Sequence, residues 1–291
     1  MAADEHAPDE PETGAGAPVP PRIVPVTTTL GPVRHTITSG HPANAFVEFC
    51  LRLADDRLVL GHRLSEWCGH APILEEDIAL ANIALDCIGQ AEAFLTVAAE
   101  AEGRGRTADE LAYFRDDIAF RNVQLCELPN GDFGVTIARQ FLWTALQVPY
   151  MKALAGSAHA QLAGAAAKAH KEHVYHLRHA AEWVLKLGDG TAESHARVQA
   201  ALELLWPYTD ELFYADGVDA AVAGPLGAPA VSTFRDDWTR TVERVLTQAT
   251  LTVPSSDWRP SGGRLGRHTE HLGPMLAEMQ SLARAHPGAQ W

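Results

Sequence analysis

Apolar residues recur at helical spacing from about residue 44 onward. Phe46, Phe49 and Leu53 begin a series in which every third or fourth position is apolar, and this series continues to Trp67. Such spacing places one apolar stripe on a helix, so we predict a helix over 44–68.

A second apolar series follows the break at Gly69. Pro72 suits the first turn of a helix, and the acidic run at 75–77 favours a helix N-terminus. The series continues to about 102, where Gly103 and Gly105 are typical of a helix end. We therefore predict a helix over 72–102.

A second pair of long helices is predicted later in the chain. The turn-forming run Asn130, Gly131, Asp132 precedes one helix, over 133–155, and Gly156 and Ser157 separate it from another over 158–187. Shorter helices are predicted at 107–120, 191–205, 231–249 and 269–285. Residues 215–230, rich in Gly, Ala and Pro, are expected to form a loop.

These elements predict an all-α protein. Short connections make each long pair an antiparallel hairpin, and the long crossover 103–132 between the hairpins is typical of ferritin-like four-helix bundles. The fold class is thus a ferritin-like long four-helix bundle with additional C-terminal helices, over 44–291. Residues 1–43 are Pro-rich and are expected to be a flexible tail, interpreted either as a docking arm or as a disordered extension.

Charge and cysteine content narrow the functional classes. The formal net charge of −14 disfavours nucleic-acid binding, which needs clustered Lys and Arg. No run of eighteen apolar residues predicts a membrane span, and no N-terminal signal pattern is present, so a cytoplasmic location is expected. The four cysteines, Cys50, Cys68, Cys87 and Cys126, are predicted to be buried free thiols.

A ferritin-like bundle raises the question of a di-iron site. Such a site needs a carboxylate on two helices and Glu-x-x-His on the other two, but no Glu or Asp in this sequence is followed by His three residues later. The second helix offers Asp86 and Gly89, and the fourth offers Glu172 and Tyr175, with His176 one residue further. One interpretation is an altered metal site; the favoured one is a polar core in which carboxylates meet His or Arg.

One local basic segment precedes the last predicted helix. Arg259, Arg264, Arg267 and His268 alternate there with glycines. Exposed amides and Arg side chains can bind phosphate, including that of coenzyme A, or an acidic partner. We predict partner docking first and phosphate binding second, with the adjoining Glu270 and His271 as further contact candidates.

Several stretches together resemble the C subunits of bacterial phenylacetyl-CoA epoxidases. These are residues 51–72, 81–90, 129–133, 137–140, 171–178 and 268–280. The resemblance covers residues 50 to 291. The tail 1–43 lies outside it.

The resemblance implies a role in a multicomponent oxygenase. Such a complex epoxidises the ring of phenylacetyl-CoA with dioxygen and NADPH-derived electrons. A paralogous A subunit holds the di-iron centre, a small B subunit bridges the assembly, and a separate reductase carries FAD and iron–sulfur groups. The C subunit is implied to be non-catalytic, without a cofactor of its own, and to position the A subunit.

Two other hypotheses stay open from the residues alone. The chain could be an oxygenase or oxidase with an altered di-metal site formed by Glu172, His176 and Asp86. It could also be a free-standing helical storage or scaffold protein. Iron content and co-purification with a second bundle protein distinguish the three hypotheses.

Overall fold

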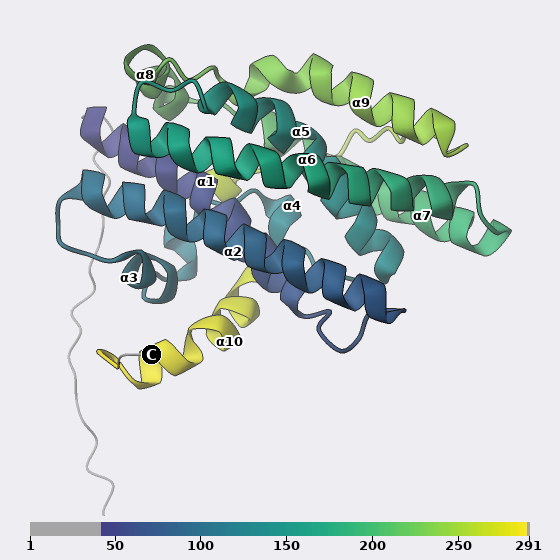
Figure 1. Ribbon diagram of the computed structural model, residues 1–291, viewed down its shortest axis with the longest axis horizontal. Coiled ribbons are helices and arrows are strands. Elements are labelled where there is room, and N and C mark those ends of the chain that lie inside the picture. The colour runs from purple at the N-terminus through teal and green to yellow at the C-terminus, as the bar shows by residue number, and fades with distance from the viewer. Residues whose placement is uncertain (1–41, 290–291) are drawn as a thin grey trace, which may run out of the picture. The chain divides into compact units, whose positions relative to one another are not determined.

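Four long helices form the centre of the structure. The computed structural model describes residues 42–289. In it, α1 (Pro42–Ser65) pairs with α2 (Leu74–Glu102), and α5 (Phe133–Leu154) pairs with α6 (Ala160–Gly188). Figure 1 shows α2 and α6 side by side at the front of the molecule. The two predicted hairpins are thus confirmed, and they fit a ferritin-like bundle.

Local sequence signals set several of the helix ends. Gly103 ends α2 in the left-handed conformation, with φ of 67°, as predicted. The Asp132 side chain accepts a hydrogen bond from the Val135 amide and begins α5. The prediction that Pro72 lies in the first turn of α2 was wrong, because that helix begins at Leu74.

The crossover contains less helix than the sequence indicated. The predicted helix 107–120 is replaced by α3 (Ala108–Tyr113) and a 3-10 turn, η1 (Asp117–Ala119), and α4 (Gln124–Glu127) follows. The cause lies on α1, where the buried Asp55 binds the Arg115 guanidinium and accepts from the Arg121 amide at 2.8 Å. These long-range bonds hold the backbone after Phe114 away from a helical path.

The expected loop at 215–230 was also wrong, since it contains α8 (Gly217–Leu226). Asp216 and Asp219 form a capping box at its N-terminus. Both carboxylates also accept hydrogen bonds from Arg52 of α1, at 2.7 to 3.2 Å. A short helix containing Pro225 is therefore fastened to the bundle by its acidic first turn.

The remaining elements pack around the bundle. They are α7 (Ala192–Leu205), η2 (Trp206–Phe213), η3 (Val231–Phe234), α9 (Arg235–Gln248), η4 (Gly263–Leu265) and α10 (Leu272–Ala285). Within 42–289 there is no strand, in agreement with the predicted all-α class. Gln280 of α10 donates to the carbonyls of Ala112 and Arg115, so the C-terminal helix is anchored on the crossover.

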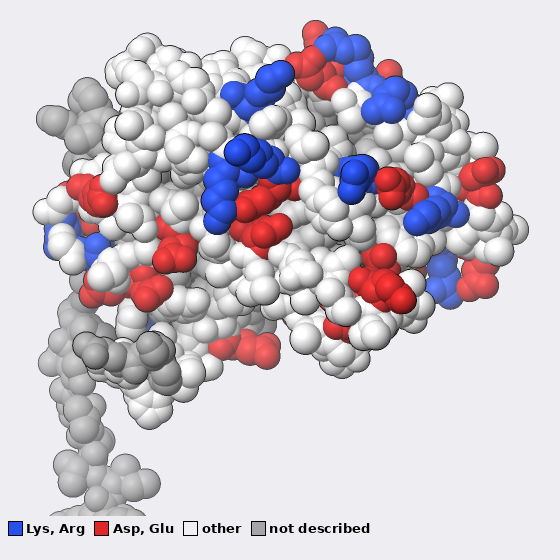
Figure 2. Space-filling model, viewed as in Figure 1, with Lys and Arg blue, Asp and Glu red and all other residues white. Residues whose placement is uncertain are grey.

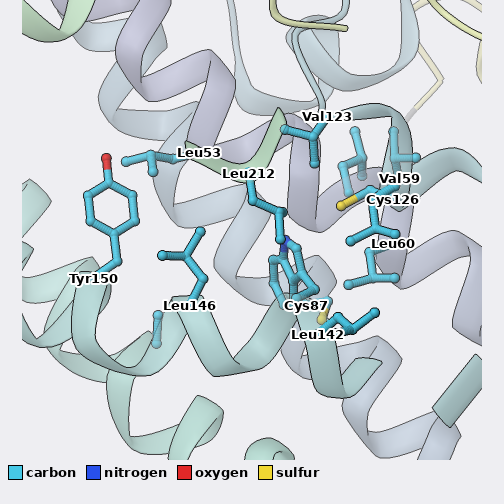
Figure 3. Close-up of a cluster of buried hydrophobic side chains, with 14 of the residues drawn as sticks. Leu53, Val59, Leu60, Cys87, Val123, Cys126, Leu142, Leu146, Tyr150 and Leu212 are labelled. Carbon is cyan, nitrogen blue, oxygen red and sulfur yellow. The ribbon is translucent and has the colours of Figure 1, made fainter. Parts of the chain in front are cut away.

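The buried core joins all four bundle helices to the C-terminal segments. Figure 3 shows Leu53 of α1, Cys87 of α2 and Leu146 of α5 in one apolar cluster with Leu212 of η2. Burial raises the pKa of the Cys87 thiol to about 12, so it behaves as an apolar group. Three cysteines are buried and free as predicted, whereas Cys68 is exposed.

Among the described helices, α2 alone is long and apolar enough to cross a membrane, judged by length and composition. The core helix of a folded bundle meets the same criterion, and α2 packs between α1 and α6. The predicted tail falls outside the described residues up to position 41, and positions 42 and 43 begin α1.

Candidate functional site

The positions expected for metal ligands lie along the seam between α2 and α6. His176 is fully buried and donates from Nε2 to Asp86 Oδ2 at 2.9 Å. Gly89 lies one turn along α2 from Asp86, and Tyr175 is turned outward, with 51% of its surface exposed. The structure therefore brings Asp86 and His176 together but not Tyr175.

Two further polar pairs continue this seam. Glu172 accepts a hydrogen bond from Gln90 Nε2 at 2.8 Å. His179 donates to Glu76 at 2.8 Å. Each carboxylate is thus bound by a side chain of the opposite helix, so that α2 and α6 are joined at three levels.

A buried arginine lies behind the seam, inside the bundle. Arg57 of α1 is fully buried. Its guanidinium donates to the Leu53 carbonyl at 2.7 Å, to Gln90 Oε1 at 2.9 Å and to Gln147 Oε1 at 2.8 Å. A fourth contact, from Nη2 to His173 Nε2, measures 3.4 Å. These partners come from all four long helices, so Arg57 links the whole bundle.

Aromatic rings complete the surroundings of this guanidinium. Its central carbon lies 4.9 Å from the Phe94 ring centre and 5.5 Å from that of Trp143. Contact with ring faces stabilises a cation removed from water. The Gln90 amide also connects Arg57 to Glu172, which brings a negative charge within two hydrogen bonds.

The protonation state of His173 follows from this arrangement. Burial holds its pKa well below the ordinary value, and the positive charges of Arg57 and His176 lower it further. A neutral imidazole offers one acceptor nitrogen, and a guanidinium can only donate. His173 Nε2 therefore accepts from Arg57, and its proton lies on Nδ1.

The residues do not fit a di-iron centre. Such a centre needs carboxylate and imidazole groups that converge on open coordination positions. Here Asp86 and Glu172 are bound to His176 and Gln90, and α1 directs a guanidinium into the same interior. Within residues 42–289, no three His, Cys, Asp or Glu side chains are grouped so as to hold a metal ion.

Two of the predicted surface contacts, Arg264 and His268, are only slightly exposed and are bound to buried carboxylates, which corrects the interpretation of the basic segment. Arg264 forms a two-pronged ion pair with Asp56, at 2.9 and 2.8 Å, and its side chain is 12% exposed. His268 donates from Nδ1 to Glu127 at 2.8 Å and from Nε2 to the Phe120 carbonyl at 3.2 Å. Buried carboxylates need such partners, so both residues fasten the segment to the interior.

The backbone amides of this segment are also engaged. Glu211 accepts hydrogen bonds from the amides of Gly262 and Gly263, both at 2.7 Å, and from the Gln124 amide at 2.7 Å. The Gly262 and Gly263 amides are therefore not exposed for phosphate, because a carboxylate of the same chain already accepts their hydrogen bonds.

Four of the predicted contact residues do reach the surface. Arg259 forms an exposed ion pair with Asp210 at 2.7 Å. Arg267 is exposed, and the 83% exposed Glu270 side chain lies 3.6 Å from His271. These four side chains are accessible to a partner, whereas Arg264 and His268 are not.

The sequence contains a signal for the buried Arg57, and this signal is independent of the Glu-x-x-His pattern. Residues 50, 53, 57, 60 and 64 follow the alternating steps of three and four that mark a buried helix stripe. Four of these positions are apolar and one is Arg57. A similar stripe on α6 includes His173 and His176, both fully buried.

Comparison with known proteins agrees with this geometry. The family model described as phenylacetic acid catabolic protein matches residues 35–291. The chain is also similar to the C subunit of 1,2-phenylacetyl-CoA epoxidase from Escherichia coli (strain K12). Identity is 49% over 248 residues, which is 85% of this chain and 100% of that protein. The chain therefore belongs to the phenylacetic acid catabolic protein family.

Proposed function

We propose that this chain is the non-catalytic C-type subunit of a phenylacetyl-CoA epoxidase, a multicomponent oxygenase of phenylacetate catabolism. The observation that carries the proposal is the 49% identity to the Escherichia coli protein over the whole of that protein's length. The filled bundle interior around Arg57 supports a role other than oxygen chemistry.

The proposal divides the work among several chains. The di-iron centre belongs to a paralogous A subunit, a small B subunit bridges the assembly, and a reductase with FAD and iron–sulfur groups delivers electrons. This chain carries no cofactor and acts in the cytoplasm. Its contribution is a rigid helical surface that fixes the position of the catalytic helices.

The interior of the bundle supplies that rigidity. Arg57 connects α1 to side chains from the other three long helices, and three polar pairs join α2 to α6. A buried polar network favours one arrangement of helices, because a shift of one helix would break the hydrogen bonds of Arg57, Gln90 and Gln147. An outer surface carried by such a bundle keeps its shape when a partner binds.

Metal analysis tests the non-catalytic assignment. The full chain and the A subunit are purified separately, loaded with ferrous iron without oxygen, desalted and analysed for bound iron. We expect stoichiometric iron in the A subunit and none in this chain. Two irons bound per chain would refute the assignment and favour the altered di-metal site of Asp86, Glu172 and His176.

Reconstitution tests the role in the complex. The A subunit, B subunit and reductase are assayed for phenylacetyl-CoA-dependent NADPH oxidation and epoxide formation, with and without this chain. We expect product only when this chain is present. Full activity in its absence, or failure of the two bundles to co-purify, would favour a free-standing scaffold protein.

A further inference from the structure

A small cavity lies where α8 meets the bundle. Its volume is about 20 Å³, and its lining combines polar and apolar side chains from several elements. The polar ones include Arg52 of α1, Tyr150 of α5, Asp219 of α8 and Arg264 of η4, and the apolar ones include Leu53 and Val231. One water molecule needs roughly 10–15 Å³ and at least two polar partners. The cavity therefore has room for a single water molecule and for little else.

Two charged groups at this cavity have hydrogen-bonding capacity that the chain leaves unused. The Nη atoms of the buried Arg52 bind Asp216 and Asp219, but its Nε has no hydrogen-bond partner among the described residues and lies 3.5 Å from Glu48 Oε1. Asp219 is also buried, and it accepts from Arg52 and from the Asp216 amide through Oδ2 only. Its Oδ1 can therefore accept from another donor. Buried polar atoms are nearly always bonded to protein or to ordered water.

The Tyr150 hydroxyl is a third polar group at the cavity. Figure 3 shows it directed away from α5, with Leu53 beside it. Burial raises the pKa of this phenol, so the hydroxyl keeps its proton and can both donate and accept. It forms no hydrogen bond with a described residue. A buried tyrosine hydroxyl normally has a partner, so a further group is expected within its reach.

The charges of this part of the chain are directed inward. Residues 220–234 contain no charged residue, and Figure 2 shows an uncharged surface over α8. The two acidic side chains at the start of α8, Asp216 and Asp219, instead bind Arg52 of α1. The polar connection between α8 and the bundle is therefore made on the inner side of α8, beside the cavity.

We propose that this cavity is a binding site for one structural water molecule, which links α8 to α1 and α5. The water accepts hydrogen bonds from Arg52 Nε and from the Tyr150 hydroxyl, and it donates one to Asp219 Oδ1. Three hydrogen bonds are the usual number for a buried water. The bridge joins three elements that are distant in the sequence, and it satisfies polar atoms that the fold removes from solvent.

The charges around the cavity favour a neutral ligand. Arg264 is already paired with Asp56 through two contacts, at 2.9 and 2.8 Å, and Arg52 is paired with Asp216 and Asp219. The free carboxylate oxygen of Asp219 repels an anion, and the two guanidinium groups repel a cation. A water molecule both donates and accepts, so it suits this mixed set of partners.

Filling the cavity tests the proposal by the sign of the stability change. Val231 lines the cavity, and Val231→Ile adds one methylene group that takes the place of the water. Loss of a bonded water leaves its polar partners unsatisfied, so we expect the melting temperature of the full chain to fall by about 2–4 °C. In a dry cavity the same group would gain contacts and raise the melting temperature. Val253→Ile is the matched control, since Val253 is 37% exposed, and it should leave the melting temperature unchanged.

Tyr150→Phe removes the hydroxyl without adding volume, so its effect is free of any strain from the added methylene group. We expect its melting temperature to fall by about 2–4 °C, because a hydrogen bond to the water is lost. The control is Tyr175→Phe, since Tyr175 is 51% exposed, and it should melt with the wild type. A Tyr150→Phe variant that melts at or above the wild-type temperature would overturn the bridge.

A crystal structure of the full chain, with a second crystal soaked in bromide, identifies the ligand directly. We expect one water peak at about 2.6–3.2 Å from Tyr150 Oη and from Asp219 Oδ1, with no anomalous signal after the soak. An empty cavity in the electron density would overturn the proposal. A bromide peak there would also overturn it, because the site would then bind an anion.

Discussion

Replacement of Arg57 is the sharpest test of how the bundle is stabilised. Its guanidinium donates to Gln90 and Gln147, at 2.9 and 2.8 Å, in a fully buried position. In the Arg57→Ala variant each of these amide oxygens loses its donor, at a cost of about 1–3 kcal/mol per group. A cavity remains as well. Together these effects should lower the free energy of unfolding by roughly 3–5 kcal/mol.

The Arg57→Met variant separates the hydrogen bonds from the volume. Methionine fills most of the space and carries no charge. The desolvation cost of burying a cation on folding is then absent, which offsets part of the loss of stability. The two glutamine oxygens still lack donors. We expect a loss of about 1–2 kcal/mol, smaller than for Ala.

The measurement is urea unfolding followed by circular dichroism, with linear extrapolation to water. Arg240→Ala serves as the matched control, because that arginine lies on the surface of α9 with 70% of its side chain exposed, and it should change stability by less than about 0.5 kcal/mol. A Met variant as stable as the wild type, or an Ala variant within about 1 kcal/mol of it, would refute the stabilising role of the network.

The remaining predictions concern pH and the C-terminal segment. Burial lowers the pKa of His268, but its hydrogen bond to Glu127 and that carboxylate's charge outweigh this and raise it. The stability that protonated His268 contributes is therefore complete below about pH 6.5 and is lost as pH rises through the raised pKa. In the His268→Gln variant the melting temperature should depend less on pH above about 6.5. The pKa of His173 is lowered, so stability should fall as pH drops below about 6.5, and His173→Gln should reduce that fall. Gly263→Ala would place a Cβ 2.1 Å from the Asn122 carbonyl oxygen, and should cost about 1–3 kcal/mol in urea unfolding.

The Gly263→Ala measurement and the histidine pH profiles each have an internal control. Gly164→Ala, on α6 with no described atom within 4 Å of its added Cβ, should be neutral or stabilising by up to about 1 kcal/mol. Equal effects of Gly164→Ala and Gly263→Ala would contradict the packing argument. Unchanged pH profiles in both histidine variants would contradict the assigned pKa directions.

The candidate site could be predicted only in part. The absence of Glu-x-x-His follows from residues three positions apart, which is a local property. The 3-4 spacing of residues 50, 53, 57, 60 and 64 was also sufficient to place Arg57 in the core. The hydrogen-bond partners of Arg57 could not be predicted, because Gln147 lies 90 positions away and His173 lies 116 positions away. Nothing in a local pattern selects which distant amide a buried guanidinium will meet.

The sequence by itself determined the four long helices and their hairpins, because apolar spacing, Gly103 and the Asp132 cap act within a few residues. Only the tertiary structure determined which polar residues are buried and which partners they bind. Arg264 looked like a surface arginine beside flexible glycines, yet it binds Asp56, which is 208 positions away. A buried carboxylate forms an ion pair with a cation that the fold places beside it, since an unpaired charge in the interior is costly. That requirement fastened Arg264 and His268 of the predicted docking segment to the interior, whereas Arg259 and Arg267 remain at the surface.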